Sequence, residues 1–380
     1  MEIAGLVSEA RSFLRPIGWR AAPRPEDLEG CLIFERDRRV GSFDGTEIAY
    51  GVYGDSGPWV ILVPGFVCPD NFWKYLLPDL ARDHRVIVYD SRGLGLSGLP
   101  RRPGYRARNL SSEDFSISNQ TRDILAVLDA VGAKQAALIG HSMGGQTILE
   151  AYRRFPNRIS ALVSLTGPFE SPIRTFYGRD FTNIFRGVDQ FLKLFPRPTI
   201  LLWRALFLAN PSIPHTVAQL GRALGPLARQ EDMDAYYRHM AFIDPLIMMK
   251  MAEAMRSHSA ADVLETIAVP TLILAGTLDM FTPVALAQAM NERVANSELV
   301  VLEGASHGAV IEKPNEVNAA VRDFLTRHQG RAKAAPKKAP AKKRSPKKTP
   351  ARKPGDPEAV REDAREHAGI DRAAISMESV

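Results

Sequence analysis

The chain has 380 residues, of which 45% are apolar and 24% are charged, and its formal net charge is +6. This composition is sufficient for a large buried core. No apolar run reaches the roughly 20 residues that a membrane-spanning helix needs, and no charged segment followed by an apolar one indicates a secretory signal. The two cysteines, Cys31 and Cys68, indicate neither a disulfide framework nor a metal site, so we expect a cytoplasmic protein.

Residues 1–30 are predicted to form an amphipathic helix and a linker. Apolar residues recur at helical spacing between Met1 and Arg20, and Pro23 and Pro25 then separate this segment from the rest. Two interpretations remain open. The helix packs on the body of the protein, or it binds a membrane surface or a partner.

Residues 31–169 are predicted to open a fold of the α/β class. The segments Arg38–Ser42 and Glu47–Tyr53 form a hairpin around Asp44-Gly45, a favoured turn pair. Strands and helices then alternate, which is typical of a mostly parallel sheet with helices on both faces. The predicted strands are Val60–Val63, Val86–Tyr89, Ala136–Ile139 and Ile159–Thr166, and the predicted helices lie near Asn71–Arg82, Ser118–Val131 and Gln146–Phe155.

The pentad Gly140-His141-Ser142-Met143-Gly144 lies between a predicted strand and a predicted helix. A serine at such a joint sits on a sharp turn, which exposes its hydroxyl above the sheet. The flanking glycines remove side chains that would clash where strand and helix meet. The pentad therefore makes Ser142 a candidate nucleophile.

Residues 170–268 interrupt the alternation with a helical segment that is rich in aromatic residues. An insertion at this point would lie over the carboxyl ends of the strands, where open sheets bind ligands. We expect a helical cap whose large apolar residues pack mostly within the cap. The aromatic content favours an apolar substrate.

Residues 269–329 are predicted to complete the core and to supply two more candidate residues. Asp279 and His307 each lie in a loop that follows an apolar strand. A serine hydroxyl needs a base, and a histidine base needs a third group to orient it. The order Ser142, Asp279, His307 fits a parallel sheet of the hydrolase type. Glu170 is an alternative acid.

These motifs resemble the α/β-hydrolase family over roughly Arg38–His328, apart from the cap. The resemblance rests on the pentad, on Gly276-Thr277-Leu278-Asp279 and on Gly304-Ala305-Ser306-His307; the segment Asp90–Ser97 also looks like a family loop. It implies a serine esterase or lipase-like member with Ser142 as nucleophile, Asp279 as acid and His307 as base.

The same resemblance implies an oxyanion hole made by the backbone N–H groups of Phe66 and Met143. Pro64 stands where members commonly carry histidine, which affects the loop geometry more than the chemistry. The family's epoxide hydrolases and dehalogenases use aspartate at the position of Ser142. Asp90 is expected to hold its own glycine-rich loop in place.

The sequence thus predicts a serine hydrolase that cleaves a small apolar carboxylic ester through an acyl-serine intermediate. Acyl transfer, thioester or lactone cleavage and perhydrolysis use the same triad and remain open. The segment Gly93–Gly98 fits G-x-G-x-x-G, but Pro100 and Pro103 follow it, so it cannot open a helix for a dinucleotide. No cofactor is expected.

Residues 330–380 are predicted to form a disordered tail. The segment 331–353 holds eleven Lys or Arg and no acid, interleaved with Ala and Pro, and cannot bury enough apolar surface to fold. Ser345-Pro346-Lys347-Lys348 resembles the repeats of linker-histone tails, which implies weak, salt-sensitive binding to DNA or another polyanion. The alternatives are a solubilising tail, or a non-catalytic body that the tail tethers to a polyanion.

Overall fold

The computed structural model describes residues 28–100, 110–172 and 195–328, with scattered positions between 183 and 194, and without the side chains of 196–200. The chain divides into two units, Met1–Lys333 and Ala334–Val380, and every described residue belongs to the first. The predicted N-terminal helix and the basic tail lie outside the described residues.

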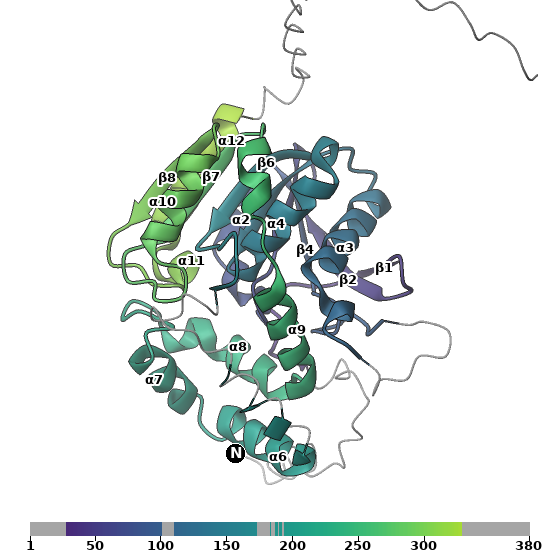
Figure 1. The fold of residues 1–380 in the computed structure, drawn as a ribbon, viewed down its shortest axis with the longest axis vertical. Coiled ribbons are helices and arrows are strands. Elements are labelled where there is room, and N and C mark those ends of the chain that lie inside the picture. The colour runs from purple at the N-terminus through teal and green to yellow at the C-terminus, as the bar shows by residue number, and fades with distance from the viewer. Residues whose placement is uncertain are drawn as a thin grey trace, which may run out of the picture. The chain divides into compact units, whose positions relative to one another are not determined.

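An eight-stranded sheet in the order β1-β2-β4-β3-β5-β6-β7-β8 forms the centre of this unit (Figure 1). Strand β2 runs antiparallel to β1 and β4, and the remaining neighbours are parallel, which confirms the predicted fold class. The strands are β1 (Arg38–Gly41), β2 (Glu47–Tyr53), β3 (Trp59–Val63), β4 (Arg85–Tyr89), β5 (Ala136–His141), β6 (Ile159–Leu165), β7 (Thr271–Gly276) and β8 (Ser297–Leu302).

Helices cover both faces of the sheet because its strands are apolar on both sides. Val60 and Leu62 of β3 point into one core with α2 (Leu76–Leu80) and α12 (Pro314–His328). Ile61 and Val63 point into the other core, which is closed by α3 (Ile117–Ala130), α4 (Met143–Arg154) and α10 (Val284–Arg293). Short helices complete the connections: η2 (Asp70–Trp73), η4 (Glu113–Phe115), η5 (Pro156–Arg158), η8 (Ala261–Thr266) and α11 (Ala309–Glu312).

The single helix predicted near Asn71–Arg82 is wrong in one respect, because two short helices, η2 and α2, replace it. Pro78 gives the physical reason. A proline has no N–H and its ring clashes with the carbonyl four residues earlier, so it is tolerated only in the first turn of a helix. Helix α2 accordingly begins at Leu76, two residues before Pro78.

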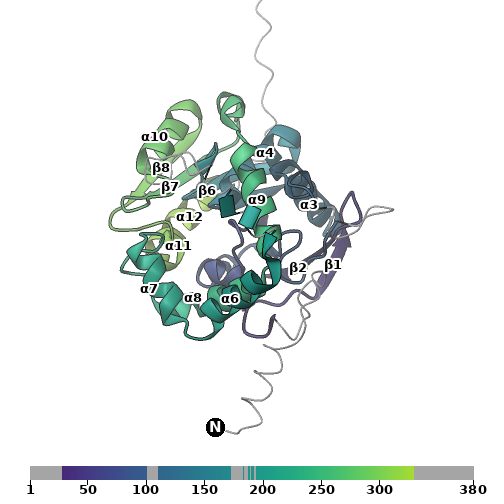
Figure 2. The same cartoon turned by 60° about the horizontal axis from the view of Figure 1, so that its bottom comes forward.

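The predicted helical insertion lies between β6 and β7. Helices α6 (Pro196–Leu208), α7 (Ser212–Leu220), α8 (Gln230–Phe242) and α9 (Pro245–Ser257) gather at one end of the sheet (Figures 1 and 2). We call these four helices the cap. Some of its aromatic side chains pack inside it: the Trp203 ring lies 4.9 Å from the Phe207 ring at an interplanar angle of 56°, and the Trp203 indole N–H donates to the Met240 carbonyl at 2.6 Å. Within the described part of the chain, we find no helix that combines the length and the apolarity needed to cross a bilayer.

The loop Asp90–Gly98 turns back on itself after β4. The N–H of Gly93 donates to the carbonyl of Gly98 at 2.9 Å, and the Asp90 carboxylate accepts from the N–H of Leu96 at 2.8 Å. Buried Arg36 pairs with the other oxygen of Asp90. The prediction that Asp90 holds its own loop is confirmed, and the G-x-G-x-x-G segment forms turns, as expected from the prolines that follow it.

Candidate active site

Ser142 occupies a strained turn between β5 and α4. Its backbone has φ 53° and ψ −123°, a left-handed conformation that is uncommon outside glycine. A Cβ placed on Gly140 would lie 2.3 Å from the carbonyl oxygen of Gly144, and one placed on Gly144 would lie 2.3 Å from that of Val63. The two glycines therefore allow the strand and the helix to meet closely enough to form this turn.

The structure brings Ser142, Asp279 and His307 together. The Nε2 atom of His307 lies 2.8 Å from the Ser142 hydroxyl, and its Nδ1 atom lies 2.9 Å from Oδ2 of Asp279. The three residues follow β5, β7 and β8, which run parallel and end at the same edge of the sheet. The topology of the sheet therefore brings together three residues that are far apart in the sequence.

Asp279 is buried and is held by several donors. Its Oδ1 accepts from the N–H groups of Phe281 and Thr282 at 2.8 and 2.9 Å, and its Oδ2 accepts from the Thr282 hydroxyl at 2.6 Å. Burial raises the pKa of Asp279, but the charge of His307 and the hydrogen bonds from His307 and Thr282 outweigh it, so the net pKa is lowered. An ionised Asp279 accepts Nδ1–H and leaves Nε2 free to take the serine proton.

Glu170 does not take this position. The acid beside Nδ1 of His307 is Asp279, whereas Glu170 lies within electrostatic reach of Arg293. Thr282, which orients Asp279, was missed in the sequence. The turn itself had a signal, because an aspartate often accepts from the N–H two residues later, here that of Phe281, but nothing in the sequence marked the Thr282 hydroxyl.

The two residues predicted to supply the oxyanion donors lie beside Ser142. Met143 opens α4, so its N–H has no partner within the helix. Phe66 follows Gly65, where an added Cβ would come within 3.0 Å of both Ser142 Cβ and His141 Nδ1. The absence of a side chain at Gly65 therefore lets the Phe66 backbone approach Ser142.

His141, beside Ser142, is a buried neutral residue that the sequence did not single out. Its Nε2 lies 3.1 Å from the backbone carbonyl of His307, and because a carbonyl can only accept, Nε2 carries the hydrogen. Its ring stacks on Phe72 at 4.7 Å. Burial, with a smaller effect of the His307 charge, lowers the pKa of His141 to about 3.

A cavity of about 330 Å³ opens beside Ser142 and His307. The core supplies residues to one side of it and the cap to the other. Of the aromatic residues in the four cap helices whose side chains the structure describes, Tyr236 and Tyr237 line it, whereas Trp203, Phe207 and Phe242 do not. The lining residues are Phe66, Cys68, Phe72, His141, Ser142, Pro172, Ala218, Ala223, Leu224, Met233, Tyr236, Tyr237, Ala252, Met255, Phe281, Thr282, His307 and Gly308.

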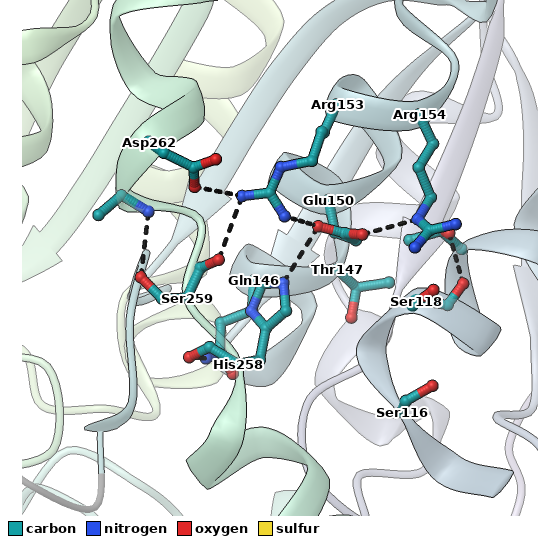
Figure 3. A network of polar contacts seen from close by, with 12 residues as sticks. Ser116, Ser118, Gln146, Thr147, Glu150, Arg153, Arg154, His258, Ser259 and Asp262 are labelled. Atoms are coloured by element: carbon teal, nitrogen blue, oxygen red, sulfur yellow. Dashed lines mark hydrogen bonds and ion pairs between the residues drawn. The ribbon is translucent and has the colours of Figure 1, made fainter. Parts of the chain in front are cut away.

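Helix α4, which directly follows Ser142, also fixes the cap. Figure 3 shows Glu150 of α4 between Arg153, Arg154 and His258, the residue that directly follows α9. One turn earlier, Gln146 donates to the carbonyl of Met255 at 3.2 Å. Burial would raise the pKa of Glu150, but its His258 and arginine partners lower it to about 2. Because Ala252 and Met255 line the cavity, these contacts set one of its walls.

The chain belongs to the family defined by the alpha/beta hydrolase fold, whose model matches residues 58–314. It is 28% identical over 267 residues to RutD of Caulobacter sp. (strain K31), named as a candidate carbamate hydrolase, covering 70% of this chain and 90% of that protein. It is 28% identical over 291 residues to epoxide hydrolase 3 of Xenopus tropicalis, covering 74% and 75%.

Among solved structures, an esterase from Exiguobacterium antarcticum superposes with a TM-score of 0.57 at 21% identity, covering 76% of this chain and 98% of the esterase. This likeness shows the fold. The protein is therefore a hydrolase of the α/β hydrolase superfamily, and the relatives leave the type of bond it cleaves open.

Proposed function

We propose that the protein hydrolyses carboxylic esters of apolar acyl groups through an acyl-serine intermediate. The observation that carries the proposal is the unbroken chain of hydrogen bonds from Asp279 through His307 to Ser142, which ends at an apolar cavity. The three side chains lie within hydrogen-bond distance of one another in the order that nucleophilic acyl transfer needs.

The reaction proceeds in two halves. Nε2 of His307 takes the Ser142 proton as Oγ attacks the ester carbonyl, and Asp279 stabilises the resulting imidazolium. The N–H groups of Phe66 and Met143 stabilise the oxyanion, an effect that is worth about 3 kcal/mol per donor in comparable sites. His307 then protonates the leaving alcohol. In the second half His307 activates a water molecule, which attacks the acyl-serine and releases the acid.

The identity of the nucleophile favours acyl chemistry over epoxide opening, although epoxide hydrolases are among the relatives. A carboxylate that attacks an epoxide forms an ester, which water can then cleave. A serine that attacks an epoxide would form an ether, which this site has no means of hydrolysing. Ser142 instead fits substrates that carry a carbonyl carbon, among which esters are cleaved more readily than amides or carbamates.

The size of the cavity favours short or medium acyl chains. Its volume of about 330 Å³ is near the lower end of ordinary small-molecule sites, about 300–1,000 Å³. Each buried methylene contributes about 0.8 kcal/mol. We therefore expect kcat/KM to rise over the first methylenes and to fall once the acyl chain exceeds the cavity.

A substrate panel tests the proposal. The purified full chain is assayed against p-nitrophenyl esters from acetate to laurate, a carbamate and styrene oxide, with Ser142→Ala as the matched control. We expect ester hydrolysis with an optimum in chain length, and a loss of roughly a million-fold in kcat for Ser142→Ala. Turnover of the epoxide or the carbamate in preference to every ester would refute the ester assignment.

A further inference from the structure

Thr166, directly after β6, has a backbone conformation that β-branched side chains disfavour. Its φ is 45°, and it is buried. A β-branched residue rarely adopts the left-handed region, so the surrounding structure must hold it there. Its N–H donates to the carbonyl of Leu274 at 2.9 Å, which fixes the residue against β7.

The Thr166 hydroxyl reaches the loop that carries the base. It donates to the backbone carbonyl of His307 at 3.2 Å, and Nε2–H of His141 donates to the same oxygen at 3.1 Å. The two donors come from the ends of β5 and β6. The main chain of His307 is thus tied to two rigid neighbouring strands of the sheet.

Thr166 also contacts the acid side of the site. Its carbonyl oxygen lies 3.0 Å from the Thr282 hydroxyl, which lies 2.6 Å from the Asp279 carboxylate. The hydroxyl has one hydrogen, and the shorter contact with the charged oxygen favours donation to Asp279. One residue therefore lies between the loops that supply the acid and the base.

We infer that Thr166 is a positioning residue for the proposed ester hydrolysis. Its backbone conformation directs the hydroxyl to the His307 carbonyl, and this contact holds the imidazole in line between Asp279 and Ser142. The inference rests on the proposed function. The expected effect on catalysis follows from geometry, because a small displacement of the His307 imidazole would greatly slow proton transfer.

The competing explanation is purely structural. The chain after β6 passes close to α4, since a Cβ placed on Gly145 would lie 2.6 Å from the Gly167 Cα. The unusual φ of Thr166 would then serve only to steer the chain past the helix. Under that explanation the hydroxyl contributes to stability, and its removal affects folding rather than turnover.

Three substitutions separate the explanations. Thr166→Val keeps the shape and removes the hydroxyl, Thr166→Ser keeps the hydroxyl, and Thr166→Gly removes it while easing the backbone. Thr121→Val is the matched control, because Thr121 is a buried threonine of α3 whose hydroxyl also donates to a backbone carbonyl, that of Ser118. For each variant kcat, KM, the rate of fluorophosphonate labelling and the melting temperature are measured.

We expect Thr166→Val and Thr166→Gly each to lower kcat about 10- to 100-fold with little change in KM, and to slow labelling to a similar extent. Thr166→Ser should stay within about 3-fold of the wild type, since it keeps the hydrogen bond. Thr121→Val should lower the melting temperature without changing kcat.

Full kcat in Thr166→Gly would overturn the inference, as would kcat losses in the Thr166 variants that merely follow their melting temperatures. If Thr166→Val fails to fold, the comparison of the glycine and serine variants still distinguishes a positioning role of Thr166 from a purely structural one. Failure of the proposed function would look different, because the wild-type protein would then neither hydrolyse esters nor react with the fluorophosphonate at Ser142.

Discussion

The turn at Ser142 and the cap that covers it are built under different constraints. Around Ser142 the main chains approach so closely that a single added carbon at Gly140 or Gly144 would overlap a carbonyl oxygen. In the cap, large side chains such as Leu202 of α6 and Leu220 of α7 are 73% and 80% exposed. Under the proposed function, the chemistry depends on the turn, where backbone geometry dictates the residue, and selectivity depends on the cap, where side chains can be exchanged.

This contrast implies that substitutions in the two regions have different consequences. Changes at the turn or among its hydrogen-bonded partners should reduce turnover for every substrate. Changes at the wall that the cap contributes should alter the ranking of substrates and leave the chemistry intact. The predictions below test the contrast, beginning with the largest effect.

Replacing the acid should reduce turnover for all esters alike. Asp279→Asn removes the charge that supports the imidazolium and orients the ring, and in a comparable triad this costs about 10⁴ in kcat. The melting temperature should change far less than the rate. Glu170→Gln is the control and should leave kcat unchanged; a larger loss in that variant than in Asp279→Asn would move the acid to Glu170.

Narrowing the cavity from the cap should change selectivity instead. Ala218 of α7 lines the cavity and is half-buried, whereas its neighbour Val217 is exposed. We expect Ala218→Leu to lower kcat/KM for the longest accepted acyl chain about 10-fold or more and to spare acetate esters. Val217→Leu should affect neither. An equal loss for all chain lengths would place Ala218 outside the acyl site.

The attachment of the cap to α4 should depend on pH. The pKa of Glu150 is lowered to about 2, below that of a free glutamate, so its stabilising contribution is complete above the unfolded value and is lost as the pH falls toward 2. Because its arginine partners are partly exposed, Glu150→Gln should cost roughly 1–3 kcal/mol of unfolding free energy at neutral pH.

The measurement is urea unfolding of wild type and variant from pH 7 to pH 2.5. The difference in unfolding free energy between wild type and variant should narrow steadily below about pH 4.5, where the free carboxyl begins to protonate. Glu265→Gln, a surface residue paired with Arg293, serves as the control and should show only a small gap. A gap for Glu150→Gln that does not change with pH would mean that the carboxylate charge contributes nothing.

The basic segment 331–353 is expected to have the smallest effect on catalysis. Truncation after Gly330 should leave kcat unchanged. Full-length protein should bind duplex DNA weakly, with an affinity that falls steeply as salt rises, because counterions are released on binding. Equal binding by the truncated protein, or binding that is insensitive to salt, would show that this segment is not a polyanion site.

The same contrast separates the features of the fold and the site that could be predicted from the sequence from those that could not. Ser142, Asp279 and His307 are recognisable because each lies in a local pattern of an apolar strand followed by a small-residue loop. The mostly parallel sheet and the helical insertion follow from the alternation of elements. These signals lie within a dozen residues of chain, where sequence patterns are informative.

The contacts that connect the loops could not be predicted in this way. Thr166 and His141 act on a carbonyl that is more than 140 residues away in the chain, as the bonds to His307 show. The cavity wall is equally non-local. The aromatic content of the cap favoured an apolar substrate, but it did not indicate which cap residues line the cavity, among them Ala252 and Met255. Which side of a cap helix faces the site depends on packing between helices.

The central claim, an acyl-serine intermediate at Ser142, is tested most directly by trapping it. The full-length protein is mixed rapidly with p-nitrophenyl butyrate, quenched in acid and analysed by intact-mass and peptide mass spectrometry. The account predicts a burst of p-nitrophenol of at most one equivalent and a butyryl group on the peptide that contains Ser142, both absent in Ser142→Ala. Ester turnover without any acylated Ser142, or with the acyl group on another residue, would contradict it.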